Sequence, residues 1–305
     1  MPEFECGPTE RGGWADRYWT SADGLRLYFR DYAGPADRPP ILCLHGLTRN
    51  SRDFADFAAR HAGKWRVIAP DFRGRGRSQW DPHPENYKPP VYAADILQLL
   101  DELEVPEAIV VGTSLGGLVA MAIAALAPQR VAAAVLNDIG PELDPTGLER
   151  IGKYVGQPAA FDSWDAVAVA LEPRQSIMHP NYRAEDWQHY ARRICRDSDG
   201  GIVFDYDMAI AENFRAAQAG PAVDAWPYFH ALRDAPLLIV RGALSDLLSA
   251  AAAQAMAEAH PDAQLVTVAH VGHAPDLTEP DSAAAIDRFL DRFLDEKIRR
   301  PPVSI

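Results

Sequence analysis

A single serine lies among glycines in the segment GTSLGG, residues 112–117, between an apolar β-branched run and a run of helix-forming residues. A serine that attacks a carbonyl carbon must be exposed yet rigidly held, and a sharp turn between a strand and a helix does both. Gly112 and Gly116 lie two residues before and two after Ser114, where side chains would collide with the turn. We therefore predict that Ser114 is a nucleophile. A phosphate-binding turn is disfavoured, because no lysine follows and the G-x-G-x-x-G spacing is absent.

Two backbone amides are expected to stabilise the negative charge that develops on the carbonyl oxygen. The turn aims the N-terminus of the following helix at this oxygen, so the amide of Leu115 is the first donor. Leu47 is expected to supply the second, because Gly46 lets the chain turn sharply after an apolar run in the segment HGLT. His45 is expected to support this loop rather than to take part in chemistry.

A serine hydroxyl is nearly inert at pH 7, so a base is required. We favour His273, which lies in a turn between the last apolar run and the last helical pattern. His270 is still within that apolar run, and we expect it to pack or hydrogen-bond locally. The remaining histidines lie in polar or helical context and are expected at the surface or at helix ends: His61, His83, His179, His189, His230 and His260.

The base needs a carboxylate that fixes its tautomer and stabilises the imidazolium. Asp246 follows the apolar run of residues 235–242 and is our first choice. Asp138 is the alternative. It lies at the end of the apolar run that follows the serine, and some α/β enzymes take the carboxylate from that position. Either aspartate could instead cap a helix or a turn.

These residues must be positioned by the elements around them. Asp23-Gly24 predicts a hairpin near the N-terminus. Six short unbroken apolar runs are typical of strands buried on both faces, as in parallel sheets; they span residues 39–46, 65–71, 108–112, 132–138, 235–242 and 263–270. Helical patterns lie between them, over residues 92–103, 115–127, 250–259 and 286–294. The alternation predicts an α/β fold with a mainly parallel sheet.

Residues 141–230 interrupt this alternation. They contain no apolar run typical of a buried strand, and their helical patterns carry many aromatic residues. We expect a helical insertion, whose aromatic residues either form a small core of their own or cover another part of the molecule. The segment DFRGRGRS, residues 71–78, is expected to be a surface loop with structural arginines rather than an anion site.

The composition excludes several classes of function. The chain has 305 residues, 48% of them hydrophobic, and a formal net charge of −13, which argues against nucleic-acid and membrane partners. Its three cysteines show no C-x-x-C spacing, and neither a signal peptide nor a membrane span is evident. We expect a cytoplasmic protein, monomeric or homodimeric, that acts on a small molecule.

Taken in order, these motifs resemble the α/β-hydrolase superfamily: HGLT, DFRGRGRS, GTSLGG, the Ser245-Asp246 pair and the GHAP of His273. The resemblance implies an eight-stranded sheet with a helical cap after the sixth strand. It implies a core over residues 17–140 and 231–299, a cap over 141–230, and tails over 1–16 and 300–305. It also implies no metal or organic cofactor.

Serine as the nucleophile separates this chain from the dehalogenases and epoxide hydrolases of that superfamily, which use aspartate. The resemblance is greatest to bacterial carboxylesterases, enol-lactone hydrolases and carbon–carbon bond hydrolases of aromatic degradation. We therefore expect an ester hydrolase for a small to medium apolar or aromatic substrate. A lactone or carbon–carbon bond hydrolase and a cofactor-free perhydrolase or oxygenase remain alternatives.

Overall fold

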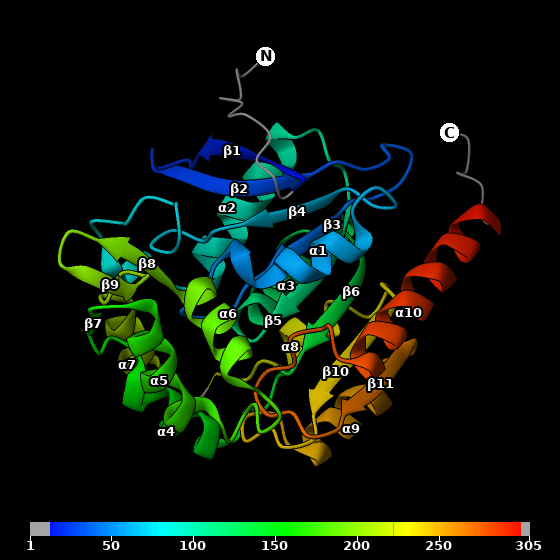
Figure 1. Ribbon diagram of the computed structural model, residues 1–305. Coiled ribbons are helices and arrows are strands. Elements are labelled where there is room, and N and C mark those ends of the chain that lie inside the picture. The colour runs from blue at the N-terminus through cyan, green and yellow to red at the C-terminus, as the bar shows by residue number, and fades with distance from the viewer. Residues whose placement is uncertain (1–12, 222, 300–305) are drawn as a thin grey trace.

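The computed structural model describes residues 13–221 and 223–299 (Figure 1). The first strand, β1, begins at Trp14, so the last three residues of the tail expected over residues 1–16 belong to a strand. A strand forms there because the residues of β1 pair with those of β2 in a hairpin, from Trp14 opposite Tyr32 to Thr20 opposite Arg26. Cys6 and the expected tail at 300–305 lie outside the described residues.

An eight-stranded sheet forms the centre of the molecule (Figure 1). All neighbouring pairs from β4 onward are parallel, and β2 pairs antiparallel with both β1 and β4. All six apolar runs form strands of this sheet, which confirms the predicted α/β fold. The strand order across the sheet is β1 (Trp14–Thr20), β2 (Arg26–Tyr32), β4 (Val67–Pro70), β3 (Ile41–Leu44), β5 (Ala108–Thr113), β6 (Val131–Asn137), β10 (Leu237–Gly242) and β11 (Ala263–Val268).

Helices cover both faces of the sheet, which is why its central strands β3, β4, β5, β6 and β10 are mainly apolar and buried. One apolar cluster joins the sheet to α2 (Pro89–Glu102), α3 (Leu115–Leu126), α8 (Trp226–His230) and α9 (Ala250–Ala259). A second cluster joins the other face to α1 (Ala55–His61) and α10 (Pro280–Arg299). Short 3₁₀ turns occur at Ser51–Phe54, Pro84–Asn86 and Pro128–Arg130. Among the described residues, no helix combines the length and apolarity needed to span a bilayer.

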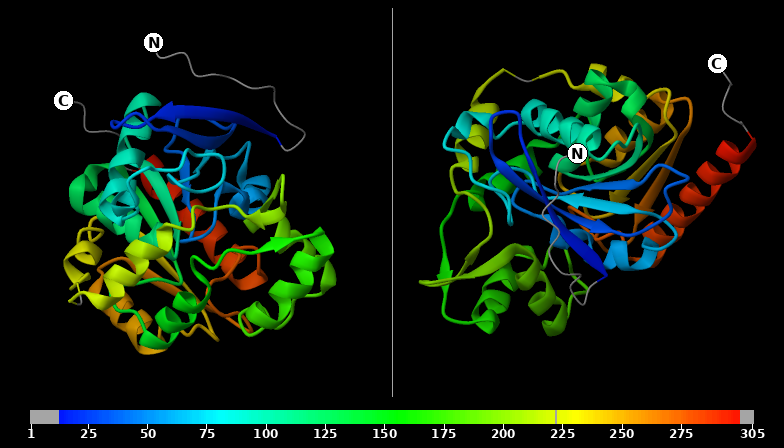
Figure 2. Two further views of the ribbon diagram at one scale, coloured as in Figure 1. Left: turned by 90° about the vertical axis from the view of Figure 1, so that its left-hand side faces the viewer. Right: turned by 90° about the horizontal axis from the view of Figure 1, so that it is seen from above.

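The insertion after β6 forms a cap, which we define as the elements from α4 to α7 (Figure 2). Its helices are α4 (Pro145–Tyr154), α5 (Trp164–Gln175), α6 (Ala184–Ile194) and α7 (Ile210–Ala219). The cap is mainly helical, as expected, but it also contains a small antiparallel sheet that was not expected, formed by β7 (Ala160–Phe161), β9 (Gly201–Phe204) and β8 (Cys195–Ser198). These strands are short and partly exposed, so no unbroken apolar run marks them in the sequence. The helix α8 packs on α3, so the core resumes before residue 231.

Most aromatic residues of the insertion belong to one of two apolar clusters; Phe204 packs against both, and Tyr228 is exposed. One group belongs to a separate apolar cluster of the cap, formed with α5 and α6: Phe161, Trp164, Tyr182, Trp187, Tyr190 and Phe204. The other group packs with the main core: Tyr154, Tyr206, Phe214, Trp226 and Phe229. Both expected roles are therefore present, a small core of the insertion and an apolar cover over the main fold.

The arginines of residues 71–78 are structural but not all at the surface, contrary to the expectation of a surface loop. Arg73 is 2% exposed and Arg75 is fully buried. Burying a guanidinium is costly unless it is paired and hydrogen-bonded. Arg73 meets this condition through three carboxylates: Asp23, Asp81 and Asp95. Arg75 instead donates to the carbonyls of Leu47 and Arg73 and to the hydroxyl of Tyr92.

Three of the histidines expected at the surface or at helix ends are buried, namely His61, His179 and His260, although His61 and His260 do lie at helix ends. His61 ends α1, where its ring packs against Phe57 with 4.5 Å between the ring centres. Burial lowers the pKa of His61 from 6.5 to about 4, although Asp287 partly opposes this. The unfolded chain therefore binds this proton below pH 6.5, whereas the folded chain binds it only below about pH 4.

The free energy of unfolding should consequently fall as the pH falls from 6.5 to 4. Replacing His61 by glutamine should reduce this slope by about 1.4 kcal/mol per pH unit, since one proton is no longer taken up on unfolding. Urea unfolding at several pH values between 4.5 and 7.5 measures the slope. His83→Gln, at an exposed position, is the matched control. Equal slopes for the wild type and His61→Gln would contradict the prediction.

Candidate active site

Ser114 lies at the junction of β5 and α3 with a φ of 51° and a ψ of −117°. A positive φ is strained for a residue with a side chain, and such strain is characteristic of functional turns. The flanking glycines are required sterically. A Cβ on Gly112 would lie 2.5 Å from the carbonyl oxygen of Gly116, and one on Gly116 would lie 1.9 Å from that of Leu44. This confirms the collision predicted from the spacing of the glycines.

His273 lies directly beside this serine. Its Nε2 is 2.9 Å from the Oγ of Ser114, although 159 residues separate the two in the chain. The loop after β11 that carries His273 is held from both sides. Asn137, at the end of β6, donates its side-chain amide to the carbonyl of Pro275, and Gly272 donates its backbone amide to the carbonyl of Met178 in the cap. The structure thus brings together Ser114 and the histidine that the sequence favoured.

The carboxylate that meets His273 is Asp138. Its Oδ2 lies 2.8 Å from the Nδ1 of His273 and also accepts the hydroxyl of Ser245 at 2.5 Å. Its Oδ1 accepts the backbone amide of Gly242 at 2.8 Å. Asp138 is fully buried, so these donors replace the water that its charge would otherwise bind.

The expectation that Asp246 would orient His273 is wrong. Asp246 forms a two-pronged ion pair with Arg150 of α4, at 2.5 and 2.8 Å. Burial alone would raise the pKa of Asp246, but the hydrogen bonds and charge of Arg150 hold it below its usual value. The two aspartates follow β6 and β10, which are neighbours in the sheet. Both aspartates therefore lie at the same edge of the sheet, and only the contacts of their side chains decide which of them meets His273.

The loop of residues 45–48 lies next to the serine, since a Cβ on Gly46 would be 3.8 Å from the Cβ of Ser114. The carbonyl of Gly46 accepts hydrogen bonds from Nδ1 of His45 and from the amide of Arg49. The C=O of Gly46 and the N–H of Leu47 belong to one trans peptide, so they point in opposite directions. The N–H of Leu47 therefore points away from the two groups that donate to the carbonyl of Gly46. Arg75 fixes the next peptide by donating its Nε to the carbonyl of Leu47 at 2.9 Å.

His45 supports this loop, as the sequence predicted. Its Nδ1 contacts the carbonyl of Gly46 at 2.8 Å, and its Nε2 accepts the amide of Phe72 at 3.0 Å. A ring that accepts at one nitrogen and donates at the other is neutral. Burial lowers its pKa to about 3, which keeps it neutral at physiological pH. His270, by contrast, is exposed just after β11.

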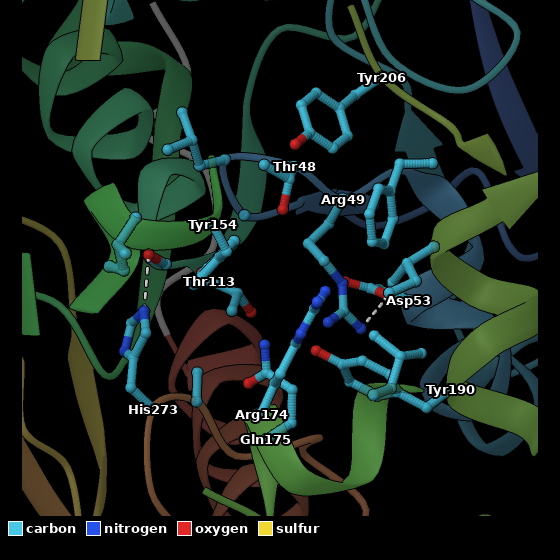
Figure 3. Close-up of a pocket in the computed structure, with 18 of the residues that line it drawn as sticks. Thr48, Arg49, Asp53, Thr113, Tyr154, Arg174, Gln175, Tyr190, Tyr206 and His273 are labelled. Carbon is cyan, nitrogen blue, oxygen red and sulfur yellow. Dashed lines mark hydrogen bonds and ion pairs between the residues drawn. The ribbon is translucent and has the colours of Figure 1, made fainter. Parts of the chain in front are cut away.

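Ser114 and His273 open onto a cavity of about 640 Å³ between the core and the cap (Figure 3). Aromatic side chains of the cap line it, including Tyr154, Tyr190 and Tyr206. Cationic side chains that sequence reasoning did not single out also line it: Arg49, Arg150, Lys153 and Arg174. They come from three separate elements, so no local motif reveals them. Within the described ranges, no group of three or more histidine, cysteine or acidic side chains could hold a metal ion.

Residues 39–280 match the family model described as the alpha/beta hydrolase fold. The chain is also 34% identical to the 3-hydroxybutyrate-oligomer hydrolase of Cupriavidus necator, over 87% of this chain and 92% of the relative. It is 32% identical to the 2-(acetamidomethylene)succinate hydrolase of Mesorhizobium japonicum, over 83% of this chain and 88% of the relative.

Among solved structures, the fold is similar to an alpha/beta hydrolase from Novosphingobium aromaticivorans. The two share a TM-score of 0.88 and 51% sequence identity, over 92% of this chain and 99% of the other. The similarity extends through the cap, because coverage of this extent includes both the core and its insertion. The architecture of core and cap is therefore shared with this structure.

Proposed function

Because the chain belongs to the alpha/beta hydrolase family, we propose that it is a serine hydrolase that cleaves a carboxylic ester through an acyl-enzyme. Ser114 is the nucleophile, His273 the general base and Asp138 the carboxylate that orients the base. The observation that carries this proposal is the hydrogen-bonded chain at the pocket: 2.9 Å from Oγ to Nε2 and 2.8 Å from Nδ1 to Oδ2. Nucleophile, base and orienting group in this order are the arrangement required for activating a serine.

In the first half of the reaction, the Oγ of Ser114 attacks the ester carbonyl while its proton passes to Nε2 of His273. The imidazolium that forms is stabilised by the buried carboxylate of Asp138. The amides of Leu47 and Leu115 stabilise the carbonyl oxygen as it becomes negative. When the tetrahedral intermediate collapses, the bond to the leaving alcohol breaks, and His273 returns its proton to that alcohol.

In the second half, water replaces the alcohol. His273 takes a proton from the water as the water attacks the acyl carbon, and the same two amides bind the second oxyanion. Collapse then releases the carboxylic acid and returns the proton to Ser114. The buried hydrogen bonds of Asp138 with Gly242 and Ser245 keep its carboxylate in place through both halves.

The tyrosines on the cavity wall suit a substrate with apolar parts, as the sequence led us to expect. The relative from Cupriavidus necator is named for 3-hydroxybutyrate oligomers, which contain ester bonds between small hydroxy acids. We include such oligomers among the esters that this pocket would accept. A small oligomer and a short acyl ester both fit a cavity of about 640 Å³.

Covalent labelling tests the nucleophile. A fluorophosphonate ester should modify the folded protein once, and mass spectrometry of its peptides should place the adduct on Ser114, because only an activated serine reacts quickly. The matched control is Ser245→Ala, which removes a different serine hydroxyl of the site, the one that donates to Asp138, and should still be labelled. An adduct on a different residue, or none on an active preparation, would overturn the assignment.

A further inference from the structure

The pocket holds more positive charge than the composition suggests. The chain is acidic, with a formal net charge of −13, yet four cationic side chains line this one cavity. They come from the loop after β3, from α4 and from α5. The fold, rather than a basic segment of sequence, gathers this charge at the place where the substrate binds.

Two of these cations are neutralised by carboxylates. Arg49 donates two hydrogen bonds of 2.7 Å to Asp53, and its guanidinium stacks on the ring of Tyr190 at 4.4 Å. Arg150 forms the two-pronged pair with Asp246. Each guanidinium therefore already has the planar, two-oxygen partner that suits it.

Lys153 and Arg174 differ from these two. Lys153 pairs with Glu149 at 3.0 Å on the exposed side of α4, where such pairs are weak. No carboxylate among the described residues pairs with Arg174. Arg174 is therefore the cation of the pocket whose charge the surrounding protein leaves uncompensated.

Capping the carbonyls at the end of α5 does not explain why the side chain of Arg174 lies at the pocket. Arginines in the last turn of a helix often serve the terminal carbonyls. Here Ser176 already donates to the carbonyl of Glu172, and the amides of Met178 and His179 donate to that of Gln175. Figure 3 shows the side chain of Arg174 extending into the pocket that His273 also enters, with Gln175 beside it.

We propose that Arg174, assisted by the amide of Gln175, binds a free carboxylate of the substrate at the end remote from the ester bond. The inference rests on the proposed function and specifies its substrate class as an ester that carries a free carboxylate away from the bond that is cleaved. A guanidinium binds a carboxylate through two parallel hydrogen bonds, and the amide of Gln175 can donate a third. Esters that are neutral at that end can form only weaker hydrogen bonds there, without the charge-assisted pair.

Two esters with the same leaving group test this role: 4-nitrophenyl hydrogen adipate and its methyl ester at the remote end. The wild type should favour the acid in kcat/KM, and added NaCl should reduce this preference because the site is open to solvent. Arg174→Gln should lower kcat/KM for the acid about tenfold, mainly through KM, and change the methyl ester less than about twofold. Arg174→Lys should retain part of the preference.

Lys153→Gln is the matched control, since it removes one positive charge from the same pocket. It should leave the ratio of kcat/KM for the acid to kcat/KM for the methyl ester within about twofold of the wild type. The reason is that Lys153 contributes to the field of the pocket but makes no directed contact with the carboxylate. An equal loss in Lys153→Gln and Arg174→Gln, or an unchanged ratio in Arg174→Gln, would overturn the inference. A preference of the wild type for the methyl ester would also overturn the inference, and this result needs no variant.

The two proposals fail separately. If the wild type cleaves both esters and Ser114→Ala cleaves neither, the proposed function stands whatever the ratio of the two esters. If the wild type cleaves neither ester nor the 3-hydroxybutyrate dimer, the proposed function itself fails. Thermal unfolding of each Arg174 variant, with a midpoint equal to that of the wild type, shows that a changed ratio reflects binding.

Discussion

Replacement of Ser114 by alanine should lower kcat for ester hydrolysis by about 10⁴- to 10⁶-fold. In the proposed mechanism the Oγ of Ser114 forms the acyl-enzyme, and His273 has no proton to take without it. Members of such a group act as a unit, so losing one removes most of the contribution of all three. Any activity of the variant above the uncatalysed rate in water would come from the amides of Leu47 and Leu115 and from substrate binding.

A panel of 4-nitrophenyl esters, lactones, aromatic ring-cleavage products and 3-hydroxybutyrate oligomers measures this effect on the wild type and on Ser114→Ala. It also separates the alternatives, because the preferred class identifies the bond that is cleaved. Poor ester turnover together with dependence on an added peroxide would favour the perhydrolase alternative. Wild-type rates in Ser114→Ala would show that another residue is the nucleophile.

Replacement of Asp138 by asparagine should lower kcat by about 10⁴-fold. The oxygen of the new amide must stay on the N–H of Gly242, which needs an acceptor. The NH₂ group would then face His273, so Nδ1 would have to accept and the ring proton would move to Nε2. An imidazole protonated at Nε2 cannot take the proton of Ser114.

Asp246→Asn is the matched comparison, because Asp246 was the carboxylate favoured by sequence alone. Its loss breaks the pair with Arg150 and weakens the attachment of α4 to the core, but it leaves the hydrogen bonds of His273 in place. We expect less than about a tenfold change in kcat. The reverse order, with Asp246→Asn severely impaired and Asp138→Asn near wild type, would contradict the assignment of Asp138.

The sequence was sufficient for the parts of the site that depend on local structure. Gly112 and Gly116 around Ser114 predict a strained turn because the clash of a Cβ there involves only residues of the turn and its neighbouring strand. The apolar runs predict the strands, since burial on both faces leaves no alternation in the sequence. His273 was identified because it lies in a turn directly after the last of these strands.

The sequence alone did not decide the features that depend on contacts between distant segments. Asp138 and Asp246 both follow strands that end at the same edge of the sheet, and their local sequences are equivalent in this respect. The choice between them was made by Arg150, 96 residues away in the cap, which pairs with Asp246. The burial of Arg73 was hidden in the same way, because its three carboxylates come from other segments of the chain.

The sequence by itself therefore determined the alternation of strands and helices in the core, the serine of the strained turn and the histidine that lies within hydrogen-bond distance of it. Each follows from sterics or burial within a few residues. Only the tertiary structure decided which aspartate completes the site, which arginines are buried, and that Arg174 enters the pocket without a carboxylate partner among the described residues. These depend on which charges meet across the fold, and charges pair through space regardless of their separation along the chain.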